Sequence, residues 1–250
     1  MQNRQREGNR GRRNSSFNQK ERDIFRKERE NEREKEKISS WAPKTKVGRL
    51  VKEGKIKSMD ELLEKGIVIL EDEIVDSLLK LNSEFIFIGQ SKGKFGGGKR
   101  RIWKQTQKKT KEGNISTFAC LAVVGDGNGH IGLGYGRSKE TLPAREKALR
   151  KAKLNIIKID RGCGSFDCSC HELHTIPMKS EGKCASVEIK LFPAPQGTGL
   201  VVGDEVKKVL RLAGIKDIYG KTFGKVRTST NLIKATIGAL KKAKIKENKE

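Results

Sequence analysis

Apolar residues return at helical spacing over residues 41–81, and this pattern predicts a leader of short helices. Ser58 and Glu61 have the spacing of a capping box, which marks the start of one of these helices. Residues 84–88 are instead aromatic and β-branched, so we expect a strand to follow the leader. The apolar positions that carry the helical period are Val47, Leu50, Val51, Leu62, Leu63, Ile74, Val75, Leu78 and Leu79.

A strand–turn–strand–helix pattern comes next. Residues 118–124 are almost wholly apolar and predict a buried strand, and residues 126–129 (Asp-Gly-Asn-Gly) are typical of a hairpin turn. Residues 131–135 predict the partner strand, and a helix is expected over residues 139–156. The predicted core face of that helix consists of Leu142, the aliphatic stem of Arg145, Ala148, Leu149, Ala152 and Ile156.

The last apolar pattern predicts a second small unit with the order β-α-β-α. Residues 185–192 alternate as a strand, and a short strand region is expected over residues 215–223. Each is followed by a stretch with helical apolar spacing. The residues expected to begin the two helices are Asp204 and either Ser229 or Thr230.

These patterns together predict an α+β protein with charged ends. Residues 1–40 hold five apolar side chains and no periodic face, so they cannot bury enough surface to offset their ordering entropy. We expect a polar extension that is disordered or forms a solvated single helix, or a basic arm that folds along nucleic acid. The predicted divisions are an extension over 1–40, a helical leader over 41–81, a first unit over 82–158, a linker over 159–180, a second unit over 181–240 and a basic tail over 241–250.

Charge narrows the choice of partner. The 250 residues include 55 Lys+Arg against 31 Asp+Glu, giving a formal net charge of +24 and a pI near 9.9. A polyanion is therefore the expected partner. The sequence has no apolar run of the ~18 residues needed to cross a bilayer, and its first residues lack the apolar region of a secretory signal. We expect a cytosolic protein without a membrane partner.

Much of the positive charge lies in residues 89–113, which hold nine bases, one acid and six glycines. We expect a long flexible loop here, and a loop of this length in a compact domain is usually functional. Trp103 lies within it, and packing is favoured over stacking on a base. On the helix expected over residues 139–156, one face presents Lys147, Arg150 and Lys151, for which phosphate contact is favoured over a solvated face. The candidate RNA-binding residues are Arg100, Arg101, Lys108, Lys109, Lys111, Arg137, Lys139, Lys147, Arg150 and Lys151.

Three cysteines and a histidine form a candidate metal site in the linker. Cys163, Cys168, Cys170 and His174 have the spacing C-x4-C-x-C-x3-H. Thiolate and imidazole ligands suit tetrahedral zinc, and four protein ligands would make the site structural. His171 is the alternative fourth ligand, but its position next to a cysteine would require a tighter chelate. The competing interpretation is a set of reduced, uncommitted side chains in a flexible linker.

The remaining motifs do not predict an enzyme. Residues 127–132 match G-x-G-x-x-G, but a strand and not a helix is expected to follow. Residues 171–174 are one residue short of the H-E-x-x-H spacing, and residues 214–222 are one residue longer than a P-loop. Cys120 and Cys184 lie in predicted strands and are expected to be small core residues. No cofactor other than zinc and no small-molecule substrate is expected.

Several ordered motifs resemble the small-subunit ribosomal protein S5 family. These are residues 123–136 (VVGDGNGHIGLGYG), 193–199 (PAPQGTG) and 212–216 (LAGIK). The opening over residues 41–51 (WAPKTKVGRLV) is similar to the archaeal and eukaryotic branch, and the cysteine cluster looks archaeal. The resemblance covers approximately residues 41–240.

The resemblance implies a first unit like a double-stranded-RNA-binding domain and a β-α-β-α second unit. It also implies contact with small-subunit rRNA and neighbouring ribosomal proteins, and a position near the channel through which mRNA enters, with roles in subunit assembly and decoding accuracy. Residues 109–113 match the RNA-contacting loop of the family, whereas Gln196 replaces a usual Arg and Ala185 a usual Gly. The alternative is a free double-stranded-RNA-binding regulator that shares the fold.

Overall fold

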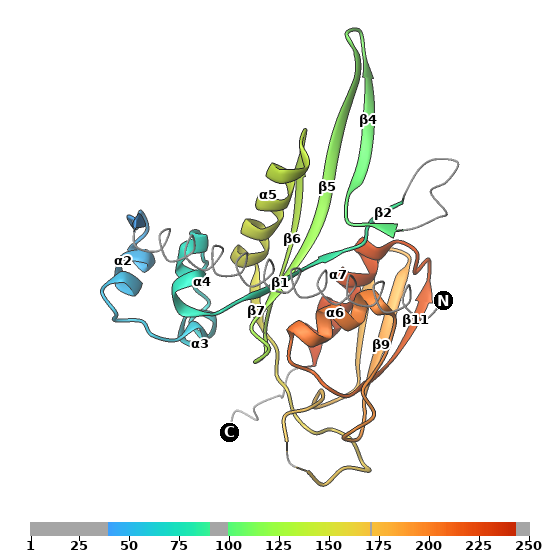
Figure 1. Ribbon diagram of the computed structural model, residues 1–250. Coiled ribbons are helices and arrows are strands. Elements are labelled where there is room, and N and C mark those ends of the chain that lie inside the picture. The colour runs from blue at the N-terminus through green and yellow to red at the C-terminus, as the bar shows by residue number, and fades with distance from the viewer. Residues whose placement is uncertain (1–39, 91–99, 171, 244–250) are drawn as a thin grey trace, which may run out of the picture.

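The computed structural model describes residues 40–90, 100–170 and 172–243. Nearly all of the predicted extension over 1–40 and most of the predicted tail over 241–250 lie outside this part of the chain. The described residues form two larger sheets, a two-stranded ribbon and several helices, which confirms the α+β prediction (Figure 1). Among them, no helix combines the length and the apolar character needed to span a membrane.

The predicted leader consists of three short helices. They are α2 (Lys46–Lys52), α3 (Met59–Glu64) and α4 (Asp72–Leu78). The capping interaction at α3 is confirmed, because the Ser58 hydroxyl accepts from the Glu61 N–H at 3.4 Å and donates to the Glu61 carboxylate at 2.7 Å. The Glu71 carboxylate ties the chain ahead of α2 to α4, since it accepts hydrogen bonds from the Trp41 indole at 2.8 Å and the Thr45 N–H at 2.7 Å.

The first sheet has the strand order β1-β5-β6-β7, with β4 added alongside β5, and all its pairs are antiparallel. The predicted hairpin turn over residues 126–129 joins β5 to β6. One end of the β4–β5 pair projects well beyond the rest of the molecule (Figure 1). The strands are β1 (Asn82–Ile86), β4 (Lys104–Thr110), β5 (Gly113–Gly125), β6 (His130–Ser138) and β7 (Ile156–Lys158).

The expectation of a single flexible loop over residues 89–113 is wrong where the structure describes it. This stretch contains β2 (Gly89–Gln90), β3 (Arg100–Arg101) and the seven-residue strand β4. Because β4 carries no large apolar side chain, its sequence has no alternation to reveal it, and its partner β5 holds it in place. Trp103 is partly buried against the core beneath the leader, which confirms packing as its role.

Glycines on β6 bring α5 (Thr141–Leu154) very close to the sheet. A Cβ atom on Gly134 would lie 2.0 Å from the carbonyl oxygen of Ala148, so only small residues fit between helix and strand. The prediction that Leu142 belongs to the core is wrong, because its side chain is 65% exposed. Ile156 is buried but belongs to β7 and not to the helix. The residues at the contact are Gly132, Gly134 and Gly136 on the strand and Ala144, Ala148 and Ala152 on the helix.

Charged contacts fasten the leader to the first sheet. His130 is 7% exposed and lies between two carboxylates, with Nδ1 2.6 Å from Asp126 and Nε2 3.2 Å from Asp60. Lys158 of β7 also reaches Asp60, at 2.9 Å. The hydrogen bond to Asp126 is the main reason that the pKa of His130 is raised above its usual value. The imidazolium form is therefore the one that this contact stabilises.

The second sheet has the order β10-β11-β9-β8, which is two strands more than the sequence predicted. Helix α7 packs on β8 and β9, and α6 contacts α7 as well as β1, β5 and β6 of the first sheet. The structured part of the last helix runs to Lys242, two residues into the predicted tail. The elements are β8 (Ser180–Cys184), β9 (Val187–Pro193), β10 (Leu200–Val201), α6 (Asp204–Leu212), β11 (Ile218–Gly224) and α7 (Ser229–Lys242).

The turns and caps of this unit differ in detail from the predictions. Gly203 and Thr228 occupy the cap positions of α6 and α7, one residue earlier than expected, and neither makes a side-chain capping bond. Cys184 ends β8 and is partly buried against the core. Ala185 opens the two-residue turn between β8 and β9 with a φ of 52°, in the left-handed region that favours glycine. Replacing the usual Gly here therefore strains the backbone.

One apolar core joins the two units. Leu121, Val123 and Ile131 on the first sheet belong to the same buried cluster as Val209 and Leu210 on α6. The approach is close, because a Cβ on Gly125 would lie 2.3 Å from the carbonyl oxygen of Leu212. This shared core fixes the relative positions of the surfaces described next.

Candidate nucleic-acid interface and metal centre

A groove of about 1140 Å³ separates the strands β2–β4 from the beginning of α7. Arg100, Arg101 and Lys104 line it from the first unit, and Arg227 lines it from the second. Its described lining residues include no carboxylate. The first turn of α7 also opens into the groove and contains no acidic residue, so the positive end of the helix dipole is not neutralised locally. The groove can therefore hold an anionic chain.

Arg227 was not among the candidates predicted from the sequence, because it lies more than a hundred residues from the other bases of the groove. The sequence near Arg227 gives only weak signals of an anion-binding position. These are a single Arg next to hydroxyl residues and the start of a helix without an acidic residue. Only the shared core brings this segment opposite β3 and β4.

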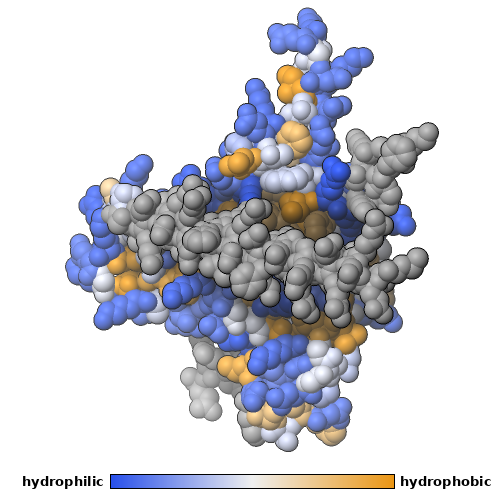
Figure 2. All heavy atoms as spheres, in the orientation of Figure 1, coloured by the Kyte–Doolittle hydropathy of each residue, from blue (hydrophilic) through white to orange (hydrophobic). Residues whose placement is uncertain are grey.

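The projecting β4–β5 hairpin presents lysines at its far end. Lys108, Lys109 and Lys111 are all exposed, and Lys111 lies in the tight turn between Thr110 and Gly113. Figure 2 shows that hydrophilic side chains cover much of this projection. The hairpin is thus a basic arm with a defined β structure.

The remaining candidate bases differ in whether their side chains already contact other residues of the protein. Lys147 and Lys151 of α5 are exposed, and within the described part of the chain neither makes an ion pair. Arg150 on the same helix instead contacts Asp72 of α4 at 3.2 Å, so it helps to hold the leader. Arg137 donates to the Thr117 hydroxyl at 3.0 Å, while Lys139 is exposed just before α5.

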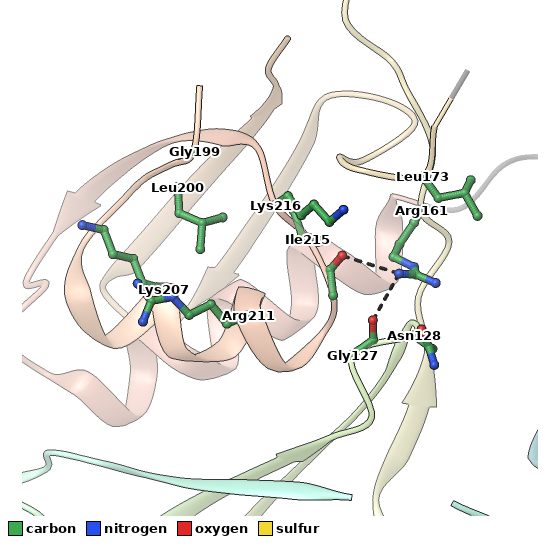
Figure 3. Close-up of a pocket in the computed structure, with 11 residues that line it drawn as sticks. Gly127, Asn128, Arg161, Leu173, Gly199, Leu200, Lys207, Arg211, Ile215 and Lys216 are labelled. Atoms are coloured by element: carbon green, nitrogen blue, oxygen red, sulfur yellow. Dashed lines mark hydrogen bonds between the residues drawn. The ribbon is translucent and has the colours of Figure 1, made fainter. Parts of the chain in front are cut away.

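A second basic pocket, of about 850 Å³, lies between the β5–β6 turn and α6 (Figure 3). Its described lining includes Arg161, Lys207, Arg211 and Lys216 and no acidic residue. The Arg161 guanidinium donates to the carbonyl oxygen of Gly127 at 3.2 Å, which keeps this charge against the turn. None of these four bases was among the sequence candidates, because they come from three separate segments.

The four predicted metal ligands come together in the linker. The sulfurs of Cys163, Cys168 and Cys170 and a ring nitrogen of His174 all lie within 4.8 Å of one another. The sulfurs of Cys168 and Cys170 are 3.0 Å apart, and Cys168 is 3.7 Å from His174 Nε2. The hydrogen bond between the two thiols is the main reason that the pKa of Cys168 is lowered to about 6. A thiolate-rich N/S donor set of this kind fits tetrahedral zinc.

The structure places His174 in this cluster. His174 is 1% exposed, and its Nδ1 lies 2.9 Å from a carboxylate oxygen of Asp217, so Nε2 faces the sulfurs. The alternative ligand, His171, lies outside the described residues. Cys120 is fully buried, with burial raising the pKa of its thiol to about 11, which confirms it as a core residue.

Comparison with known proteins gives matches in both units. Residues 102–160 match the family model of the ribosomal protein S5 N-terminal domain, and residues 182–249 match that of the C-terminal domain. The chain is 52% identical over 206 residues to the small ribosomal subunit protein uS5 of Nanoarchaeum equitans, covering 82% of this chain and 88% of the relative. It is 48% identical over 203 residues to the protein of the same name from Hyperthermus butylicus, covering 80% and 88%. The protein of that name from Methanocaldococcus jannaschii is 46% identical over 205 residues, covering 82% and 88%.

Proposed function

Because the chain belongs to the ribosomal protein S5 family, we propose that it is a structural, rRNA-binding constituent of the small ribosomal subunit in the cytoplasm. The identity of about half of the aligned residues to proteins named for that subunit carries the proposal. The net charge of +24 agrees with a permanent RNA partner. Membership of this family does not favour an enzyme or a free RNA-binding regulator.

Co-sedimentation tests this role directly. After a high-salt wash of cell extracts, the protein should remain with small subunits, because a subunit constituent is also held by contacts with its neighbours that salt does not weaken as it weakens phosphate contacts. A protein found mainly in the free fraction of cells with intact ribosomes would contradict the proposal and favour the regulator.

We propose that the phosphates of rRNA contact the groove between β2–β4 and the beginning of α7. The support is that Arg100 and Arg101 face Arg227 across a concave surface whose described lining has no carboxylate. Guanidinium groups suit phosphate because they offer several donors in one plane. The first turn of α7 adds partial positive charge from its backbone amides.

The hairpin and α5 extend this proposed contact. Lys108, Lys109 and Lys111 lie on an arm that projects beyond the rest of the molecule (Figure 1). Lys147 and Lys151 are exposed without ion pairs in the described structure. Arg150 is expected to contribute less, because its guanidinium already contacts an aspartate. The proposed contacts are completed by Arg137 and Lys139.

Salt dependence distinguishes phosphate contacts from solvated charges. Lys109→Gln or Lys147→Gln should weaken binding to small-subunit rRNA and lower the slope of log affinity against log salt by about one unit. Lys183→Gln, which removes an exposed charge from β8, is the matched control and should leave the slope unchanged. If all three variants had the affinity and the salt slope of the wild-type protein, Lys109 and Lys147 would belong to a solvated surface.

We further propose that this protein lies near the channel through which mRNA enters the subunit, next to other small-subunit proteins. The support is the family resemblance of residues 109–113 together with the reach of the hairpin. A photo-cross-linker at Lys111 should capture mRNA in programmed small subunits, whereas one at exposed Lys183 should not. Loss of the hairpin charges should also change the frequency of misreading.

We propose that the chain is divided functionally at the boundaries predicted from the sequence. We also propose that the unit over 82–158 is like a double-stranded-RNA-binding domain. The family-model match over 102–160 ends two residues past the proposed unit over 82–158, and the match over 182–249 covers the proposed unit over 181–240 from its second residue and most of the proposed tail. Limited proteolysis should cut first between these divisions, and fragments that begin inside them would contradict the boundaries.

We propose that Cys163, Cys168, Cys170 and His174 bind one structural zinc ion. The support is the convergence of four suitable ligand atoms in a linker that has little core of its own. Metal analysis of chelator-free protein should give about one zinc per chain. Cys168→Ser should abolish this, whereas Cys184→Ser, a cysteine outside the cluster, should not. A wild-type protein with far less zinc and freely reactive thiols would refute the site.

A further inference from the structure

The cysteine cluster is fastened to the second unit by a buried carboxylate. Asp217, just before β11, is 4% exposed. One of its oxygens lies 2.9 Å from His174 Nδ1, and the other accepts the Gly199 N–H at 2.7 Å. A buried carboxylate is costly unless hydrogen-bonded, so these two partners explain how Asp217 is tolerated there.

The two contacts of Asp217 have different consequences. The contact with Nδ1 orients the imidazole and favours the tautomer that carries its proton on Nδ1. The lone pair of Nε2 then points toward the cysteine sulfurs, as a metal ligand requires. The contact with Gly199 fixes the loop over residues 195–199, at a residue whose φ is +73°.

The same loop also contacts the segment that carries the cysteines. The side-chain amide of Gln196 donates to the carboxylate of Glu172 at 3.3 Å, and Glu172 lies between Cys170 and His174 in the chain. Gln196 stands where the resemblance leads one to expect Arg. Here the shorter neutral amide joins the loop to the cysteine segment.

The loop and the immediate neighbours of His174 and Asp217 also line the basic pocket in Figure 3. Gly199 and Leu200 line it from the loop side, and Leu173 and Lys216, the neighbours of His174 and Asp217, line it as well. The His174 carbonyl oxygen accepts the N–H groups of Lys216 and Asp217 at 2.9 and 3.1 Å. A change in the position of His174 would therefore move this part of the pocket lining.

We infer that Asp217 is a positioning residue that couples metal binding to the 195–199 loop and thereby shapes the basic pocket. This inference rests on the proposed zinc site. Metal binding holds His174 by Nε2, His174 holds Asp217 through Nδ1, and Asp217 holds the Gly199 amide. Without the metal, only the hydrogen bonds keep this chain of contacts together.

Zinc affinity of the full chain tests the first part of the inference. Asp217→Asn keeps the size of the side chain but removes its charge, so zinc affinity measured by chelator competition should fall by about 10- to 100-fold. Asp204→Asn, which alters a 93% exposed side chain on α6, is the matched control and should bind as the wild type does. Far-UV circular dichroism of both variants checks that the fold is retained.

Hydrogen exchange of the Gly199 amide in the wild-type protein tests the second part without relying on a variant, because added zinc should slow exchange of this amide. In Asp217→Asn, which circular dichroism has checked for folding, the slowing should be lost. If the wild type binds no zinc, the zinc site itself is refuted and the coupling with it. If it binds zinc but Asp217→Asn binds equally well, or Gly199 exchange ignores zinc, only the role of Asp217 is refuted.

Discussion

Replacing Gly134 with Ala adds a single methyl group where α5 lies on β6. The new Cβ would lie 2.0 Å from the carbonyl oxygen of Ala148 and 2.3 Å from the backbone nitrogen of Ala152. Ordinary contact begins at 3.4 Å, so the helix must retreat by more than 1 Å. The obstacle is helix backbone and not a flexible side chain, so no rotamer change can relieve it.

The loss of stability follows from the contacts between α5 and β6 that this retreat would break. Ala144, Ala148 and Ala152 are fully buried against the strand, and a gap of this size forfeits about half of the dispersion energy at each contact. Overpacking a core costs about 1–3 kcal/mol, and this rigid contact lies at or above the upper end of that range. We therefore expect Gly134→Ala to lower the free energy of unfolding by about 3 kcal/mol.

Urea unfolding followed by circular dichroism measures the change, read as a shift of the midpoint at constant m-value. Gly238→Ala is the matched control, because this glycine lies inside α7 and a Cβ there would meet nothing within 4 Å. It should raise stability by about 0.5–1 kcal/mol, since Ala has the higher helix propensity. A stability change for Gly134→Ala of less than about 0.5 kcal/mol would refute the contact argument.

Three other predictions concern single side chains. Ala185→Gly should raise the free energy of unfolding by about 1 kcal/mol, because it relieves a left-handed backbone, and an unchanged urea midpoint would count against the strain. The pKa of His130 is raised in the folded protein, so protonated His130 stabilises the fold. This stabilisation is complete below the pKa of the unfolded state, about 6.5, and is lost as the pH rises from there through the higher pKa of the folded state. His130→Gln should flatten that fall in a series of urea midpoints, and a profile like that of the wild type would refute the role of the Asp126 contact. Glu71→Ala should lower the free energy of unfolding by about 2–3 kcal/mol and change the wavelength of the tryptophan emission maximum, because the Trp41 indole N–H loses its carboxylate partner; an unchanged spectrum would contradict this.

Local patterns in the sequence determined many of the regular elements, although not the polar and very short strands. The helical period, the capping pair at Ser58 and the turn over residues 126–129 each depend on neighbours within a few positions. The four candidate metal ligands were also visible as a group, because they lie within twelve residues. The family motifs were equally local, and the family matches agree with them.

Tertiary structure decided whatever depends on an approach between distant segments. Strand β4 is polar on both faces and exists because β5 pairs with it, while Leu142 is exposed because glycines on β6 admit only alanines beneath α5. Likewise, the chain position of Asp217 says nothing of its contact with His174, 43 residues away. A sequence pattern reports the period of one element, whereas packing distance and burial depend on both surfaces that meet, and those exist only after folding.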